Sequence, residues 1–287
     1  MTAAELPRLT GPLDLTGGPA CPPLPPEGDG PLLAAEARLA TRDDAPRAAL
    51  FASWRLPAAA AARYAPPSSA LHLVAVNRVT GRVLQGAVRD PEAPPARVHP
   101  DAEPAPFLAY AEGALTCDLH ELLGLPADGL PWRLVVWLGE AVGAVLDLVA
   151  PGAPAAEPAL LDSAPLAVEA AAGAPPEALA VTPAPAPPGE RSTPWDTVLR
   201  GVGVAPPLEP GPRWLTLLAL ETTGRRVHAA GALLPADLPA GAGFTFALPA
   251  ASLLPSNPAP EAHLVLALVG DAASAPVRLE PLEVDAP

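Results

Sequence analysis

The hydrophobic positions along the chain come in short runs that are separated by turn residues. Residues 71–77 are mostly apolar, the dipeptide Thr80-Gly81 follows them, and apolar residues resume at Val83 and Leu84. Short apolar runs on either side of a glycine-containing turn are typical of a β-hairpin. Because both faces of the first run are apolar, we expect an interior strand of a β-sandwich.

A second hairpin and one helical turn complete this pattern. Residues 134–138 and 144–149 flank the turn dipeptide Gly139-Glu140 and predict a closing hairpin. Between the two hairpins, the segment 118–123 begins at an acidic N-cap candidate, Asp118, and is followed by a Gly-x-Pro stop. We therefore expect a single helical turn inside an otherwise β-rich domain.

Three segments of the first half of the chain recur, in the same order, in the second half. The matched pairs are LHLVAVNRVTGR (71–82) with WLTLLALETTGR (214–225), LTCDLHELLGLP (115–126) with FTFALPAASLLP (244–255), and WRLVVWLGEA (132–141) with HLVLALVGDA (263–272). The first match sets Leu71 against Trp214, which favours burial of Trp214. Common order and similar spacing indicate an internal duplication.

Composition narrows the fold class further. Of the 287 residues, 44 are proline, and since an interior proline costs a helix about 3 kcal/mol, long helices are disfavoured. About seven short strands per domain is typical of a sandwich. We predict an all-β protein of two tandem immunoglobulin-like or fibronectin-like β-sandwich domains, related by internal duplication. The likeness is architectural, since the cysteine and tryptophan spacing of antibody domains is absent.

Proline-rich passages mark the predicted domain boundaries. We predict an irregular proline-rich arm at 1–30, a first sandwich at 31–150, a Pro/Ala linker at 151–164 and a second sandwich at 165–287. The arm is expected either to dangle or to lie along a partner.

Charge excludes several classes of function. All 17 basic residues are arginine, and without lysine the chain has neither a P-loop lysine nor a Schiff-base amine. The formal net charge of −14 disfavours binding to nucleic acid or to an anionic membrane surface. Residues 130–151, the most apolar stretch, contain three charged side chains, which argues against a membrane span. Residues 1–15 lack the apolar core of a secretory signal, so we expect a cytoplasmic protein.

Candidate chemistry is sparse. None of the five histidines stands in a recognised metal-binding motif, and His72 and His263 are interpreted as ordinary strand residues. For His99, close to acidic residues in VHPDAEP, a solvated acidic loop is the favoured interpretation, and a metal ligand is the alternative. Cys117 is matched by Phe246 in the repeat, which indicates a small buried hydrophobe and argues against a reactive thiol. We predict no disulfide with Cys21, no catalytic residue, no bound metal and no cofactor.

Aromatic side chains offer the remaining candidate interaction surface. Trp132 and Trp137 are five residues apart in a predicted strand, so they point to opposite faces and one of them belongs to the core. Trp54, Trp195 and Tyr110 are left as the candidate interaction residues.

Three classes of function follow from these expectations. The first is a non-enzymatic structural or interaction protein that presents two sandwiches to protein partners or to further copies of itself. The alternatives are a small-molecule or carbohydrate-binding module, and an enzyme or metal-binding accessory protein whose site is not visible in the sequence.

Overall fold

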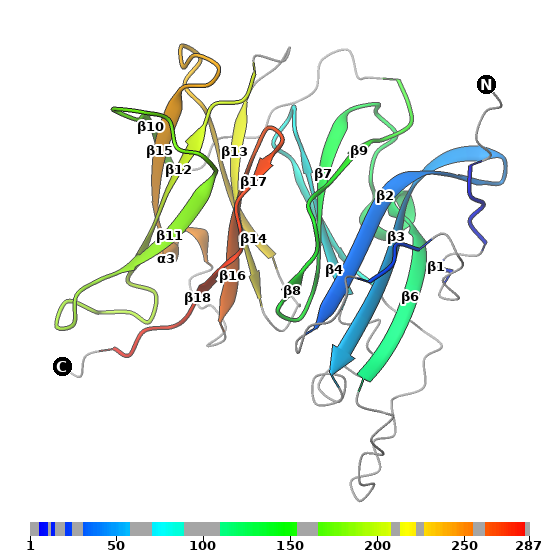
Figure 1. The fold of residues 1–287 in the computed structure, drawn as a ribbon, viewed down its shortest axis with the longest axis horizontal. Coiled ribbons are helices and arrows are strands. Elements are labelled where there is room, and N and C mark those ends of the chain that lie inside the picture. The colour runs from blue at the N-terminus through cyan, green and yellow to red at the C-terminus, as the bar shows by residue number, and fades with distance from the viewer. Residues whose placement is uncertain are drawn as a thin grey trace, which may run out of the picture. The chain divides into compact units, whose positions relative to one another are not determined.

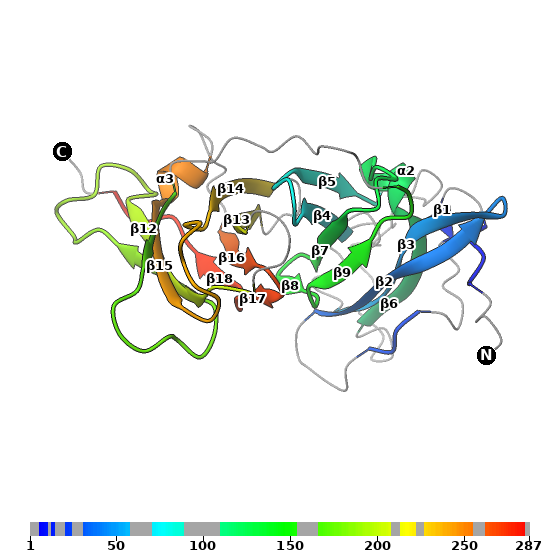
Figure 2. The same cartoon turned by 90° about the horizontal axis from the view of Figure 1, so that it is seen from above.

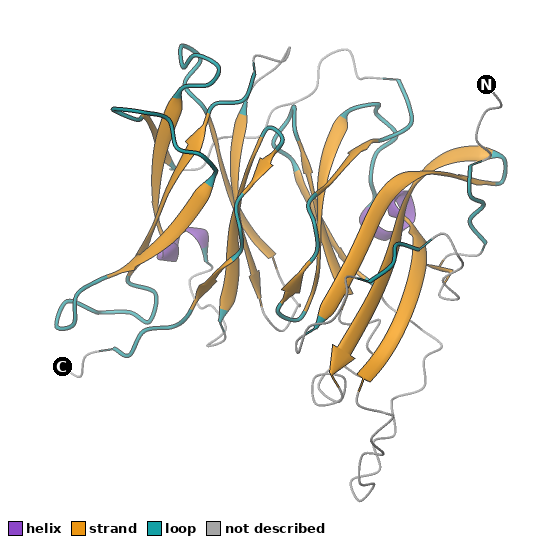
Figure 3. Cartoon of the chain, viewed as in Figure 1, coloured by secondary structure: helices purple, strands orange, loops and turns teal. Residues whose placement is uncertain are grey.

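The computed structural model describes residues 6–10, 13–14, 21–24, 31–57, 71–88, 110–153, 166–207, 213–221, 227–254 and 262–284. Its chain divides into two compact units. Unit 1 comprises Met1–Asn77 with Val83–Glu157, and unit 2 comprises Arg78–Arg82 with Pro158–Pro287. In these described residues, nearly all regular structure is β-strand in antiparallel sheets, with two short helices, so the all-β prediction is confirmed (Figure 3). In the parts of the chain just given, no helix has the length and apolar character needed to cross a membrane.

Unit 1 contains two antiparallel sheets. Sheet A has the strand order β1 (Leu13–Asp14), β6 (Tyr110–Asp118), β3 (Ala45–Pro57) and β2 (Leu32–Arg42). Sheet B has the order β5 (Val83–Ala87), β4 (Leu71–Asn77), β7 (Pro131–Leu138) and β8 (Ala141–Val142), and β9 (Leu146–Val149) also pairs with β7. The β4–β5 hairpin and the closing pair β7–β9 confirm the two hairpins predicted from the sequence.

The core of unit 1 lies between sheets A and B, which form two layers (Figure 1). Leu50 of β3 and Leu115 of β6 belong to the same buried cluster as Leu73 of β4 and Val136 of β7. Trp132 is also in this core, whereas Trp137 points to the other face of sheet B and stacks on His72 at a ring-centroid distance of 5.4 Å. The opposite orientation of the two tryptophans is the one that strand alternation predicts.

The predicted helical turn is present as α2 (Leu119–Leu123). Asp118 is its N-cap, and the backbone N–H of His120 donates to the Asp118 Oδ1 atom at 2.8 Å. Gly124 ends the helix with a φ of 64°, in the left-handed region that glycine adopts at low cost. Both ends of this short helix were therefore readable from the sequence.

Unit 2 contains the same two kinds of sheet. Sheet C has the order β10 (Ala167–Ala170), β15 (Gly243–Pro249), β12 (Thr197–Val204) and β11 (Ala180–Pro185). Sheet D has the order β14 (Val227–Leu233), β13 (Trp214–Glu221), β16 (His263–Val269) and β17 (Ala272–Ala273), and β18 (Val277–Leu279) also pairs with β16. The short helix α3 (Ala250–Leu253) follows β15 as α2 follows β6. Strand for strand, in chain order, the two units have the same pairing pattern, and the two sheets of unit 2 also form layers (Figure 2).

The strand register corrects one of the sequence matches. Leu71 of β4 is in the core cluster of unit 1, and the equivalent residue of β13 in the core cluster of unit 2 is Leu215. Trp214 is buried, as predicted, but lies outside that cluster. The sequence match of Leu71 with Trp214 is therefore out by one residue. Every position of both strands is buried, so no alternation of polar and apolar residues was available to fix the register.

Residues 7–9 of the predicted N-terminal arm are held against sheet A. The backbone N–H of Leu9 donates to the Thr41 carbonyl at 2.8 Å, and the Thr41 N–H donates to the Pro7 carbonyl at 2.9 Å. The Leu9 side chain is buried in a small cluster with Ala40 and Phe51 on the outer face of sheet A. The arm therefore lies along unit 1 at these residues and does not dangle.

Candidate functional site

The outer face of sheet C carries a groove with a volume of 470 Å³. Its lining comes from all four strands of the sheet and includes Glu169, Ala180, Thr182, Arg200, Val202 and Ala247. Each of these six residues is exposed. Apart from the two charged residues they have small side chains, so this face of the sheet is hollow and mostly apolar.

The packing beneath the groove, on the inner face of sheet C, depends on two glycines of β12. The rings of Phe244 and Phe246 on β15 lie across from Gly203 and Gly201 on β12, on the inner face of the sheet. A Cβ atom added at Gly203 would lie 2.5 Å from the Phe244 Cζ atom, so only glycine fits beneath the ring. Glycine at these two positions of β12 therefore leaves room on the inner face for the cross-strand aromatic rings.

The corresponding face of unit 1 is covered. In sheet A, Ala49 pairs with Arg38 on one side and with Asp118 on the other. In sheet C, Arg200 holds the equivalent position, because it pairs with Thr182 and Ala247. Next to Ala49, Phe51 is 1% exposed, because the arm residues Leu9 and Cys21 pack against its cluster and the Arg38 guanidinium lies 4.2 Å above its ring.

Val202 occupies the place of Phe51 in sheet C and is 37% exposed. Among the described residues, the same sheet face is therefore closed by an extended segment in unit 1 and open in unit 2.

Two of the three aromatic residues predicted for an interaction surface are buried. Trp54 is 6% exposed and belongs to the core of unit 1, where its ring lies over Gly113 of the paired strand. Trp195 is also 6% exposed and belongs to the core of unit 2. Neither ring is presented at the surface as a stacking platform. Tyr110 begins β6, and its side chain lies outside the described part of the chain.

A hydrogen-bonded loop turns Trp195 inward. The Asp196 carboxylate accepts hydrogen bonds from the backbone N–H of Thr193 at 2.8 Å and from that of Ser192. These bonds, that of Thr193 first, hold the pKa of Asp196 at about 2. Trp195 then packs with its edge against the ring of His263, at a centroid distance of 5.2 Å.

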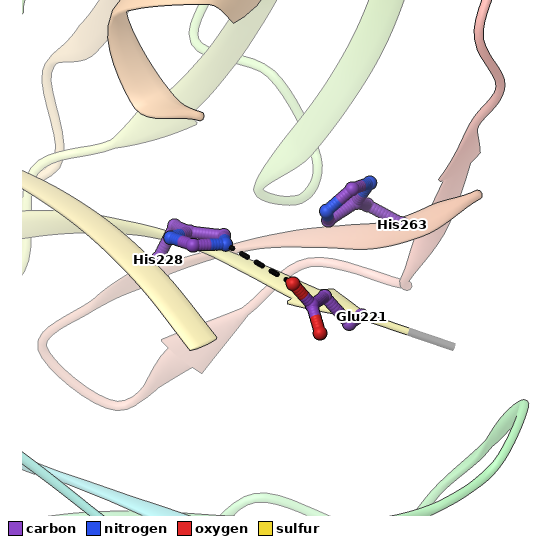
Figure 4. A group of neighbouring side chains, drawn as sticks. All are labelled: Glu221, His228 and His263. Atoms are coloured by element: carbon purple, nitrogen blue, oxygen red, sulfur yellow. Dashed lines mark ion pairs between the residues drawn. The ribbon is translucent and has the colours of Figure 1, made fainter. Parts of the chain in front are cut away.

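His263 belongs to a second group of functional side chains, which sequence reasoning missed. Glu221, His228 and His263 come from three neighbouring strands, β13, β14 and β16 (Figure 4). One candidate ligand atom from each lies within 4.8 Å of those from the other two. The His228 Nε2 atom is 3.6 Å from the Glu221 Oε1 atom, and the two imidazole centroids are 6.0 Å apart. We call these three residues the Glu–His–His cluster.

The register of sheet D places the cluster at one end of the core. Glu221 pairs directly with His263, and His228 pairs with Ala219, a core residue. All three side chains therefore point to the inner face, on the same side as Ala219. Glu221 is 5% exposed and His263 is fully buried, whereas the side chain of His228 retains 16% of its exposure.

The remaining candidates carry less chemistry. His99 lies outside the described residues. His72 is buried, and burial lowers its pKa to about 4, which keeps the ring neutral at physiological pH. Cys117 is buried in the core of unit 1, and burial raises the pKa of its thiol to about 12. Neither Cys117 nor Cys21 forms a disulfide, and the Cys21 thiol donates to the Leu115 carbonyl at 3.5 Å.

The sequence did contain a signal for the Glu–His–His cluster. Glu221 ends a strand of otherwise uncharged residues, and His263 begins another, so each places an ionisable group at the end of a fully buried strand. The pairing of the two strands was needed to show that these ends meet.

The chain matches no model of a known protein family, and no curated protein matches it either.

Proposed function

We propose that this chain is a cytoplasmic, non-enzymatic interaction protein whose second unit binds an extended segment of a protein partner in the groove of sheet C. The observation that carries the proposal is the difference between two corresponding sheet faces. One is closed by residues 7–10 and Cys21 of the chain itself, and the other is open over a volume of 470 Å³.

The cover in unit 1 indicates the chemistry of the partner. Leu9 and Pro7 belong to an extended, proline-rich stretch that fixes itself through backbone hydrogen bonds to Thr41 and through one buried leucine. A partner segment for sheet C is accordingly extended and apolar, with proline and alanine between its anchoring side chains. Glu169 and Arg200 stand in the groove and supply one charge of each sign for orienting polar groups of the partner.

The proposal also covers the origin of the two units by duplication and the cellular compartment of the protein. Common strand order in both units supports an immunoglobulin-like architecture that arose by duplication, with the N-terminal segment recruited as a cover in the first copy. Cys21 and Cys117 do not form a disulfide, which is compatible with a reducing compartment. Burial of Trp54 and Trp195 removes the feature that would have favoured a carbohydrate-binding module.

The proposal is tested by blocking the groove in the full chain. Immobilised wild-type protein, a Thr182→Arg variant and a Val149→Arg control are compared for the proteins that they retain from the native host. Val149 is 59% exposed on β9 of unit 1, a strand that does not line the groove, so the control adds the same charge at another exposed strand position.

A partner retained by the wild type and the control, but not by Thr182→Arg, is the expected result. It should also be displaced by a synthetic peptide of residues 5–24, which has the chemistry of the cover. Equal retention by all three proteins, or no displacement by the peptide, contradicts the proposal. Light scattering on the purified chain shows whether the partner is a second copy.

A further inference from the structure

The Glu–His–His cluster is chemically unusual for the end of a β-sandwich core. Glu221 and His263 are almost entirely buried, and the nearest described neighbours of His263 include the apolar ring of Trp195. A carboxylate taken out of water costs several kcal/mol unless it is paired with a positive charge or a metal. The His228 Nε2 atom, at 3.6 Å from the carboxylate, is too distant for a good hydrogen bond.

Unit 1 shows that the fold does not require polar residues at this place. Its cross-strand pair Asn77 and Trp132 corresponds to Glu221 and His263, since each pair joins the same ends of equivalent strands. In the same way, Ala75 of unit 1 pairs with Leu84, and the equivalent Ala219 of unit 2 pairs with His228, so Leu84 is the counterpart of His228. Unit 1 thus fills the position with one amide and two apolar side chains. The acidic and imidazole groups are specific to unit 2 and call for a reason other than packing.

Coordination geometry supplies that reason. Nitrogen and oxygen ligands lie about 2.0–2.2 Å from zinc, so two ligands of a tetrahedral ion are about 3.4 Å apart. The three ligand atoms of the cluster lie within 4.8 Å of one another, so small side-chain rotations would bring them to the spacing that the ion requires. Two imidazoles and one carboxylate form a ligand set that suits zinc and other first-row transition ions, whereas calcium and magnesium prefer oxygen ligands alone.

From this arrangement we propose that Glu221, His228 and His263 bind one divalent transition-metal ion, with zinc as its representative. The Glu221 carboxylate neutralises half of the charge of the ion, and each imidazole donates one nitrogen lone pair. Three protein ligands leave at least one coordination position for water or for an oxygen or nitrogen donor from outside the chain. His228, the only partly exposed member of the cluster, marks the side from which the ion enters. The proposal is independent of the groove on sheet C.

The test uses the untagged full chain, stripped with a chelator and dialysed. Isothermal titration with Zn²⁺ and metal analysis after gel filtration measure affinity and stoichiometry, and Co²⁺ absorption reports the ligand geometry. The wild type should bind one Zn²⁺ per chain, and its melting temperature should rise with added zinc. His228→Ala and Glu221→Gln should each lower the affinity at least about tenfold, since even residues that only orient metal ligands contribute 10–100-fold.

Two controls separate loss of a ligand from loss of the fold. His99→Ala removes the histidine that the sequence offered as a ligand, and it should bind zinc as the wild type does. His228→Ala changes the most exposed member of the cluster, so its metal-free form should melt within a few degrees of the metal-free wild type.

The proposal is overturned if the stripped wild type binds no Zn²⁺, Co²⁺ or Cu²⁺, or if His228→Ala and Glu221→Gln bind zinc as tightly as the wild type. Loss of binding in His99→Ala alone would place the ion elsewhere and would also overturn it.

Discussion

The cover on sheet A can be tested by truncating its one buried leucine. Leu9 is 7% exposed in the cluster with Phe51, whereas Leu6, three residues earlier, is 39% exposed. Leu9→Ala removes three carbon atoms from this cluster, which at about 0.8 kcal/mol per buried carbon amounts to about 2.4 kcal/mol. The site is at the edge of the molecule and can collapse around the gap, so we expect little additional cavity cost and a total loss of about 2–3 kcal/mol.

Urea unfolding followed by tryptophan fluorescence measures this loss, because unit 1 contains Trp54, Trp132 and Trp137 as reporters. The matched control Leu6→Ala should change the unfolding free energy by less than about 0.5 kcal/mol, as expected of an exposed side chain. Equal effects of Leu9→Ala and Leu6→Ala would refute the packing of the arm on sheet A, and with it the contrast between the two units on which the proposed function rests.

Three further outcomes are expected from single substitutions or from pH. Gly203→Ala should lower the stability of unit 2 by about 1–3 kcal/mol in urea, because the new Cβ meets the Phe244 ring, and an unchanged midpoint would contradict this packing. Since burial raises the pKa of Cys117 to about 12, iodoacetamide at pH 8 should modify the half-buried Cys21 first, as followed by mass spectrometry. Equal rates of modification at the two cysteines would contradict the burial of the Cys117 thiol. Burial lowers the pKa of His72 from 6.5 to about 4. As the pH falls, the imidazole is therefore protonated in the unfolded chain before it is protonated in the folded chain, and the free energy of unfolding should decrease from pH 6.5 towards pH 4. His72→Phe should flatten the urea midpoint across that window, and an unaltered pH profile would count against a buried neutral imidazole.

Local signals were sufficient for much of the fold. The Thr-Gly turn after residues 71–77 and the Asp118 cap each depend on a few adjacent residues, and both hairpins and the helical turn are present as predicted. The register of paired strands cannot be predicted from such local signals, because it depends on a difference in polarity between the two faces of a strand. In β4 and β13 that contrast is missing, and the sequence match of Leu71 with Trp214 was accordingly out by one residue.

The candidate sites were less accessible to sequence reasoning, for a physical reason. Proline in the arm correctly argued against helix, yet proline content alone does not reveal that Leu9 packs on sheet A. Likewise, Glu221 and His263 are 42 residues apart in the chain, and only the pairing of β13 with β16 brings them together. Trp195 looked available because it stands in the loop-like segment RSTPWDT, and Trp54 because no match in the repeat assigned it to a core. Both rings are buried, as the large apolar area of an indole favours.

The contrast between the two sheet faces is tested most directly by photo-crosslinking from equivalent positions. A benzophenone side chain is placed at Arg38 in one full-length variant and at Thr182 in another, and both are irradiated in extracts of the native host. The probe at position 38 should link within the chain to the N-terminal segment, whereas the probe at position 182 should link to a second polypeptide. Links from position 182 that stay within the same chain, or links to other proteins that are equally frequent from both positions, would contradict the account.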